Sequence, residues 1–115
     1  MNHPNQAHPQ LLGLVELDQA GTVLYARLQK GEARRNLGGL NFFSDVAPFK
    51  NVAEFRRRVE DFANGPTMSD SFDFICDFDD GPVPVRVLLA RIRERMNGAQ
   101  TTSILVLIRQ ALSEA

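Results

Sequence analysis

The hydrophobic period of the chain changes after Pro66, and this change narrows the possible folds more than any other feature. From 71 to 78 every second residue is Phe or Cys, an alternation that places successive apolar side chains on one face of a β-strand. Two longer stretches follow at 83–96 and 101–110, and Asn97-Gly98 between them is a strong signal for a tight hairpin. The sequence therefore predicts three strands in an antiparallel meander.

A helix is predicted just before these strands, from Asn51 to Asn64. Its apolar residues fall three or four positions apart and so share one face; they are Val52, Phe55, Val59 and Phe62. Asn51 followed by Glu54 resembles a capping box, and Gly65-Pro66 ends the helix. Nearer the N-terminus we predict two short strands at 11–17 and 22–25, then one or two short helical turns within 27–40.

This element order predicts an α+β fold in which helices cover one face of an antiparallel sheet. The 115 residues suffice for one domain, which we place at residues 11–111. Residues 1–10 are rich in Pro, Asn and Gln and are expected to form a flexible N-terminal tail. Residues 112–115 are interpreted as the start of a C-terminal linker or tail.

Charge and composition exclude several classes of partner. Thirteen basic and fourteen acidic residues leave a net charge of −1, so nothing favours nucleic acid or an anionic membrane. A single cysteine, Cys76, excludes an internal disulfide, and no apolar stretch approaches the ~18 residues of a membrane span. The N-terminus lacks the pattern of a signal peptide. We expect a cytoplasmic protein.

Residues that could carry catalysis are sparse. The two histidines, His3 and His8, lie in the tail and leave Cys76 or a serine without a base. No metal-binding or nucleotide-binding motif is present, so we predict no catalytic residue and no metal site. The enzyme alternative is a cone-like α+β fold in which a pocket aspartate transfers a proton, with Asp45 and Asp73 as its candidates.

The central strands are apolar on both faces. Residues 104–108 read Ile-Leu-Val-Leu-Ile and 87–90 are nearly as uniform, whereas a sheet with one solvated face alternates. Helices can cover one face, and the sparse tail at 1–10 is poor cover for the other. We therefore predict that a second subunit or a neighbouring domain covers it, with a homodimer preferred. The predicted homodimer face comprises Leu88, Ala90, Ile92, Ile104, Val106 and Ile108.

A family resemblance rests on the string NFFSDVAPF at 41–49, followed by SFDF at 71–74 and the Asn97-Gly98 hairpin. Together these motifs resemble the photoactive yellow protein branch of the PAS sensor domains, from about Leu12 to Arg109. The resemblance implies a PAS fold, with a five-stranded antiparallel sheet, short helices on one face and a pocket between them.

The light-sensing members of that family attach a hydroxycinnamoyl chromophore to the Cys that ends this motif. Phe49 occupies that position here and has no nucleophile, so the thioester cannot form. A Tyr and a protonated Glu hold the chromophore in the family, and their positions fall near Ala26 and Lys30 in this chain. Tyr25 lies one residue from the position expected for the Tyr. A one-residue slip in a strand turns a side chain to the other face. Haem would need an axial His within the domain, and a flavin photocycle would need a cysteine motif of its own. The sequence has neither, so we expect no cofactor.

The resemblance and the residues together predict a non-photoactive PAS sensory and protein-interaction module of bacterial-type signal transduction. It is expected to bind rather than catalyse, as a homodimer that acts on an effector domain or a partner signalling protein. The alternative is a noncovalent sensor of a small apolar molecule, with pocket residues Phe43, Val46, Phe49, Phe55, Phe74 and Val87.

Overall fold

The computed structural model describes residues 13–28, 37–47 and 49–111. Along the chain they form β1 (Gly13–Leu17), β2 (Val23–Leu28), a short helical turn η3 (Phe42–Val46), α1 (Val52–Asn64), β3 (Ser69–Phe78), β4 (Gly81–Met96) and β5 (Ala99–Gln110). The predicted tail at 1–10, the end at 112–115 and most of the region expected to hold helical turns lie outside the described residues.

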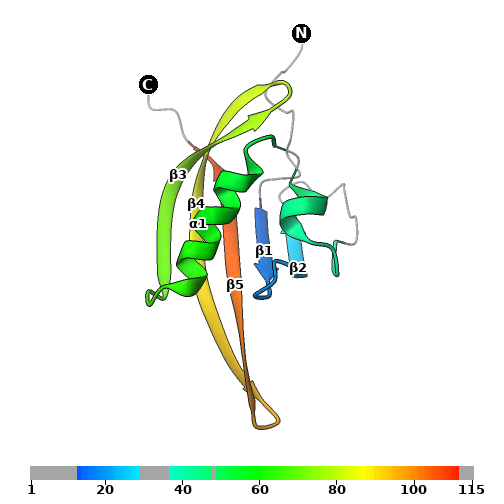
Figure 1. Ribbon diagram of the computed structural model, residues 1–115, viewed down its shortest axis with the longest axis vertical. Helices are drawn as coiled ribbons and strands as arrows, with labels where there is room; N and C mark the ends of the chain where they lie inside the picture. Colours follow the sequence, from blue (N-terminus) through cyan, green and yellow to red (C-terminus); the bar gives the residue numbers. More distant parts are fainter. Residues whose placement is uncertain (1–12, 29–36, 48, 112–115) are drawn as a thin grey trace.

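The five strands form one sheet in the order β2-β1-β5-β4-β3, and every neighbouring pair is antiparallel. The C-terminal strand β5 therefore lies at the centre, with β2 and β3 at the edges. Helix α1 and the turn η3 lie over one face, and the β4–β5 hairpin extends well beyond the other strands (Figure 1). The predicted α+β class and the meander of the last three strands are confirmed.

Reciprocal capping occurs at η3, several residues before the position where the sequence predicted it. The Asn41 Oδ1 atom accepts hydrogen bonds from the backbone N–H of Phe43 at 3.0 Å and of Ser44 at 3.1 Å. In return the Asp45 carboxylate accepts from the Asn41 N–H at 3.0 Å. These bonds satisfy N–H groups that a helix start leaves without partners, which explains the helical turn at Phe42–Val46.

The capping box predicted at Asn51 and Glu54 is wrong. Asn51 precedes α1, but its side chain does not cap the helix. Instead its Nδ2 donates to the Ile75 carbonyl at 2.8 Å and its Oδ1 accepts from the Asp77 N–H at 3.0 Å. Because β3 is an edge strand, its outward backbone groups need such partners. Asn51 thus joins the start of α1 to the sheet edge.

The hydrophobic core lies between α1, η3 and the face of the sheet that they cover. From β4 and β5 it takes the residues that share this face, namely Val85, Val87, Leu89, Ile104, Val106 and Ile108. From the helices and β3 it takes mainly phenylalanine rings. We call this side of the sheet the inner face and the opposite side the outer face.

Candidate functional site

A cluster of phenylalanine rings fills the space between α1, η3 and β3. Phe49 is 2% exposed, and its ring centroid lies 5.6 Å from that of Phe55, 6.2 Å from Phe74 and 5.9 Å from Phe78. The corresponding interplanar angles are 88°, 62° and 74°, an edge-to-face geometry that aromatic rings favour. Phe55, fully buried, also contacts Phe43 at 6.4 Å.

The structure brings the six predicted pocket residues into one core. Four are buried, namely Phe43, Phe49, Phe55 and Val87, whereas Val46 and Phe74 are half-buried and pack against the others. Since the rings contact one another, a ligand among them would have to displace ring–ring contacts. Phe49 is held inward by its neighbour, because the Lys50 N–H donates to the Asp77 carbonyl at 2.8 Å.

Cys76 belongs to the same core, on β3 opposite Val83. Its side chain is fully buried, and burial raises the pKa of the thiol from its ordinary 9.0 to about 12. The thiolate is the nucleophilic form of cysteine, so at neutral pH this group is inert. The prediction that Cys76 packs as a small buried residue is confirmed.

The two aspartates of the enzyme alternative lie apart from the ring cluster. Asp45 is exposed and accepts from the Asn41 N–H in the cap of η3. Asp73 is exposed on the outer face, where it pairs with Arg86 at 3.3 Å. Neither carboxylate is buried among apolar groups, the environment that tunes a carboxyl for proton transfer.

The residues near the family's chromophore-binding positions divide between the two faces. Tyr25 is 49% exposed and pairs with Glu16 on the outer face, which puts its hydroxyl on the side away from the rings. Ala26 is half-buried against the core, and Lys30 lies outside the described residues. Tyr25 therefore cannot reach a ligand in the ring cluster from this strand register.

The predicted dimer face needs correction, because its six residues do not share one surface. Val87 pairs with Ile108, Leu89 with Val106 and Arg91 with Ile104, which places those three β5 residues on the inner face. Ile104, Val106 and Ile108 are accordingly buried in the core. The other three residues, Leu88, Ala90 and Ile92, do lie on the outer face, paired with Leu107, Leu105 and Ser103.

The apolar centre of the outer face thus consists of half-buried side chains from three strands. They are Leu14 of β1, Leu88, Ala90 and Ile92 of β4, and Leu105 and Leu107 of β5. The sequence could not show which residues of the apolar run at 104–108 face outward, since both faces of β5 carry aliphatic residues.

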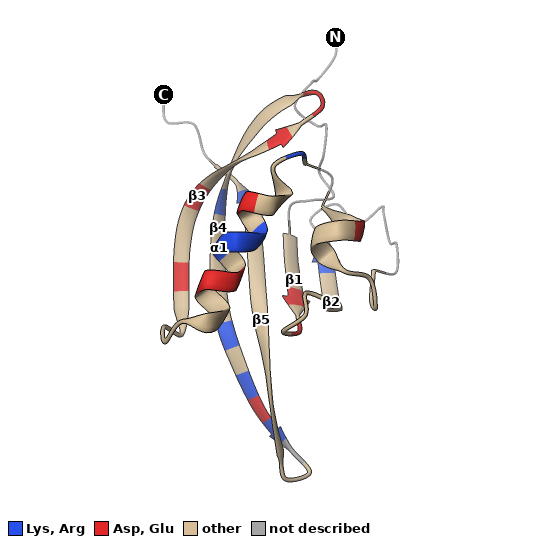
Figure 2. Cartoon of the chain, in the orientation of Figure 1, with Lys and Arg blue, Asp and Glu red and all other residues tan. Residues whose placement is uncertain are grey.

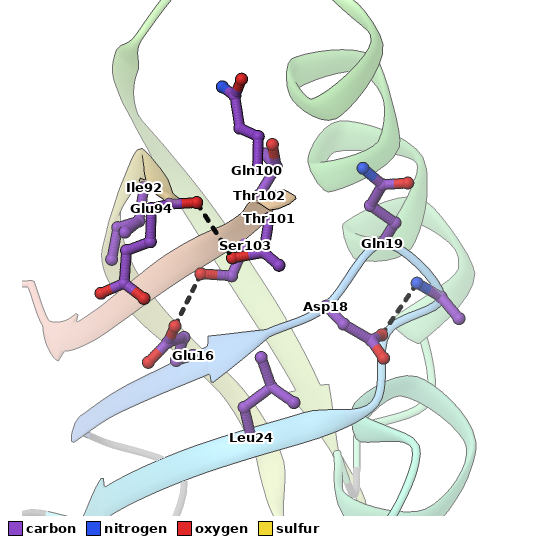
Figure 3. A pocket seen from close by; sticks show the side chains of 11 residues that line it. Glu16, Asp18, Gln19, Leu24, Ile92, Glu94, Gln100, Thr101, Thr102 and Ser103 are labelled. Atoms are coloured by element: carbon purple, nitrogen blue, oxygen red, sulfur yellow. Dashed lines mark hydrogen bonds between the residues drawn. The ribbon is translucent and has the colours of Figure 1, made fainter. Parts of the chain in front are cut away.

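An open concavity of about 600 Å³ adjoins this apolar centre at the hairpin end of the outer face (Figure 3). Its floor includes Ser103, whose Oγ donates to the Glu16 Oε2 at 2.6 Å. Asp18 and Glu94 add two more carboxylates, and the lining residues that the structure describes include no Lys or Arg. The sequence reading missed this acidic hollow, although Glu16 interrupts the apolar run at 11–17.

The described residues also bear on metal binding and on membrane crossing. Among them, no group of three or more His, Cys, Asp or Glu side chains is arranged to hold a metal ion. No helix within that part of the chain combines the length and apolarity that a membrane crossing requires.

Comparison of sequences links the chain to photoactive yellow proteins. No family model matches the chain. The photoactive yellow protein of Rhodothalassium salexigens is 33% identical over 84 residues, which are 69% of this chain and 66% of that protein. The one from Halochromatium salexigens is 32% identical over 79 residues, or 65% of this chain and 63% of that protein. The match thus spans just under two thirds of the length of these relatives.

Comparison of structures gives the same relationship over a larger part of the chain. The photoactive yellow protein domain of the sensor histidine kinase Ppr from Rhodospirillum centenum has a TM-score of 0.56 and 27% identity, and the match covers 92% of this chain and 99% of that one. The PAS domain of an HTR-like protein from Haloarcula marismortui has a TM-score of 0.52 over 93% of this chain and 88% of that one, but at 18% identity it shows the fold alone. The chain belongs to the PAS domain family, in the branch related to photoactive yellow protein.

Proposed function

We propose that this chain is a PAS sensory module that works without a covalently attached chromophore and signals by associating with other proteins. The observation that carries the proposal is the burial of Phe49 among Phe55, Phe74 and Phe78. The resemblance places the chromophore-attaching cysteine of the family at this position. A phenyl ring offers no atom that could form a thioester, and here it occupies interior space itself.

The single cysteine of the chain does not replace the missing attachment point. Cys76 is fully buried on β3, and burial raises its pKa to about 12. An activated acid would therefore meet an enclosed, protonated thiol, which reacts slowly. The module binds partners rather than catalysing a reaction, since Asp45 and Asp73 are exposed and lie outside the ring cluster.

Association takes place through the outer face of the sheet, and its first partner is a second copy of the chain. The support is the apolar centre of that face, where Leu88, Leu105 and Leu107 lie side by side on the two central strands. Contiguous apolar surface of this kind is typical of interaction sites. The module acts in the cytoplasm on an effector domain or partner signalling protein; the related domain of Ppr belongs to a sensor histidine kinase.

A second candidate function is a noncovalent sensor of a small apolar or aromatic molecule. The partial exposure of Val46 and Phe74 favours this function, because the other four predicted pocket residues are buried. These two residues mark the side from which a ligand could enter. Native mass spectrometry of the chain purified from cells tests this function, since a ligand adds its own mass to the folded chain and is lost on denaturation.

The test of the chromophore proposal is incubation of the folded chain with activated p-coumaric acid. We expect an unchanged intact mass and no visible absorbance after denaturation. The same reagent added in urea should label Cys76, which shows that the reagent is active and that folding protects the thiol. A coloured adduct on the folded chain would contradict the proposal.

The test of association is light scattering at tens of micromolar protein. We expect a mass near twice the 12.8 kDa of one chain, and dissociation on dilution. A mass of one chain at every concentration would contradict association through the outer face.

A further inference from the structure

The outer face carries charges of opposite sign at its two ends. Along β4 the outward residues run from Arg86 through Leu88, Ala90 and Ile92 to Glu94, because side chains alternate between faces. Ala90 lies midway, four residues from either charge. The outward side of β4 is therefore basic at one end, apolar in the middle and acidic at the other end.

Neighbouring strands reinforce this polarity. At the basic end Arg109 pairs with Arg86, and Arg27 pairs with Leu14. At the acidic end Asp18 lines the same hollow as Glu94. Glu16 lines it too, but it pairs with Leu105 and therefore lies level with Ala90. Besides Glu16, one more charge departs from the pattern, since Asp73 of β3 lies 3.3 Å from Arg86, with both side chains more than half exposed.

Charges on the inner side of the hairpin do not alter the pattern. Figure 2 shows basic residues along the lower part of β4, with one acidic residue among them near the hairpin. Arg93 pairs with Thr102 and Arg95 with Gln100, which places both arginines on the inner face. Glu94 between them points outward, opposite Thr101. A partner that docks on the outer face therefore meets the carboxylate.

A second copy can meet this face about a two-fold axis in either of two directions. Both make the contact self-complementary. An axis parallel to the strands sets the basic end of one copy against the basic end of the other. An axis perpendicular to the strands, at the level of Ala90 and Leu105, reverses the second copy and sets Arg86 opposite Glu94. Like charges facing across an interface are costly. The parallel axis opposes like charges at both ends of β4, whereas the perpendicular axis opposes only Glu16 to Glu16, so complementarity favours the perpendicular axis.

We infer that two copies pair antiparallel through the outer face, with Arg86 of each copy opposite Glu94 of the other. This inference rests on the proposed association through the face and adds its geometry. Leu88 of one copy then lies over Ile92 of the other, while Ala90 and Leu105 lie on the axis. Glu16 lies on it as well, with its carboxylate accepting a hydrogen bond from the Ser103 hydroxyl at 2.6 Å. The small Ala90 side chain allows the sheets to approach to the roughly 10 Å spacing of packed sheets. Apolar contact supplies affinity, and the charges set direction.

Disulfide trapping tests the geometry directly. We would prepare Arg86→Cys and Glu94→Cys as separate proteins, mix them and oxidise them. The antiparallel pair predicts a covalent dimer in the mixture and little in either protein alone. Cys76 does not compete, because it is fully buried. Arg93→Cys mixed with Arg86→Cys is the matched control, since Arg93 is exposed on the inner face of the same strand.

Charge reversal gives an independent readout. Arg86→Glu alone and Glu94→Arg alone each place like charges together at two points of the dimer, and each should weaken self-association about ten-fold or more. An equimolar mixture of the two variants pairs opposite charges at both points and should restore the wild-type affinity. Both side chains are exposed, so we expect both variants to fold. Circular dichroism checks this.

The outcomes separate the geometry from the association itself. A wild-type dimer whose Arg86→Cys and Glu94→Cys mixture fails to cross-link would overturn the antiparallel pairing and leave the association standing. If the mixture of Arg86→Glu and Glu94→Arg does not recover the wild-type affinity, the antiparallel pairing is likewise overturned while the association stands. A wild-type chain that stays monomeric overturns both.

Discussion

The Arg91 guanidinium holds the C-terminal end of α1 by a double contact with Phe62. Its Nη2 donates to the Phe62 carbonyl at 2.9 Å, and its Cζ lies 5.0 Å from the centroid of the Phe62 ring. Further bonds reach the carbonyls of Ala63 at 3.0 Å, Gly65 at 2.8 Å and Thr67 at 2.8 Å. The last carbonyls of a helix have no intrahelical partner and carry partial negative charge, so one inner-face side chain of β4 terminates the helix.

Replacing Arg91 by Met should lower the free energy of unfolding by about 2–3 kcal/mol, since it keeps the aliphatic length but removes every donor. Arg91→Lys should recover only part of this, because one ammonium cannot reach all these carbonyls. Urea denaturation measures both. Arg93→Met is the control, from the exposed part of the same strand face, and should change stability by less than about 0.5 kcal/mol. If Arg91→Met and Arg93→Met lowered the free energy of unfolding equally, Arg91 would not act through the C-terminal end of α1.

Asn51 offers a test that separates helix capping from bridging to the sheet. Ser is as good a helix cap as Asn, but its short side chain cannot span both the Ile75 carbonyl and the Asp77 N–H. Asn51→Ser should therefore destabilise the chain by about 1–2 kcal/mol, as much as Asn51→Ala. Thermal unfolding of both variants measures this, with Asn64→Ala at the exposed end of α1 as the control. Full stability in Asn51→Ser would mean that capping is the relevant role.

The elements that the sequence predicted well are those with a single hydrophobic period. The alternation at 71–78 and the Asn97-Gly98 turn determine strand identity locally, and the structure has β3 at Ser69–Phe78 and a hairpin between β4 and β5. Helix α1 likewise follows from one apolar stripe. In these segments local pattern and tertiary packing agree, so the element could be read from the residues alone.

The faces of β5 could not be assigned from the sequence. A run of five aliphatic residues has no alternation to show which of them point inward, and a register shift of one residue exchanges the faces. The partners decide instead, because Val87 and Leu89 share a face with Ile108 and Val106. The bridge made by Asn51 was hidden for a related reason, since its partners Ile75 and Asp77 lie more than twenty residues away.

Phe49 should be among the most costly core residues to truncate. Phe49→Ala removes a ring that contacts three others and should destabilise the chain by about 3–5 kcal/mol, whereas Phe49→Leu should cost about 1–2 kcal/mol and remain folded. Ile75→Ala is the control, because Ile75 is 55% exposed. Urea denaturation measures all three. A loss below about 1 kcal/mol in Phe49→Ala would show that the ring does not pack in the core.

The cavity left by Phe49→Ala should accept a small ring, because apolar cavities of this size stay dry and bind benzene-like molecules. We expect benzene or p-cresol to raise the unfolding midpoint of Phe49→Ala and to leave that of the wild-type chain unchanged. Stabilisation of the wild-type chain by the same compounds would instead support the noncovalent sensor function.

The Cys76 thiol should make stability fall in alkaline solution. Its pKa rises from 9.0 to about 12 on folding, so above pH 9 the unfolded chain releases a proton that the folded chain retains. The contribution is complete below pH 9 and is lost as the pH rises toward 12, at about 1.4 kcal/mol per pH unit. The readout is the difference in the free energy of unfolding between the wild-type chain and Cys76→Ala in urea denaturation, because the two chains differ only at the thiol. Between pH 8 and pH 10 the wild-type advantage over Cys76→Ala should shrink by about 1.4 kcal/mol. A constant difference would mean that the thiol is not desolvated in the folded chain.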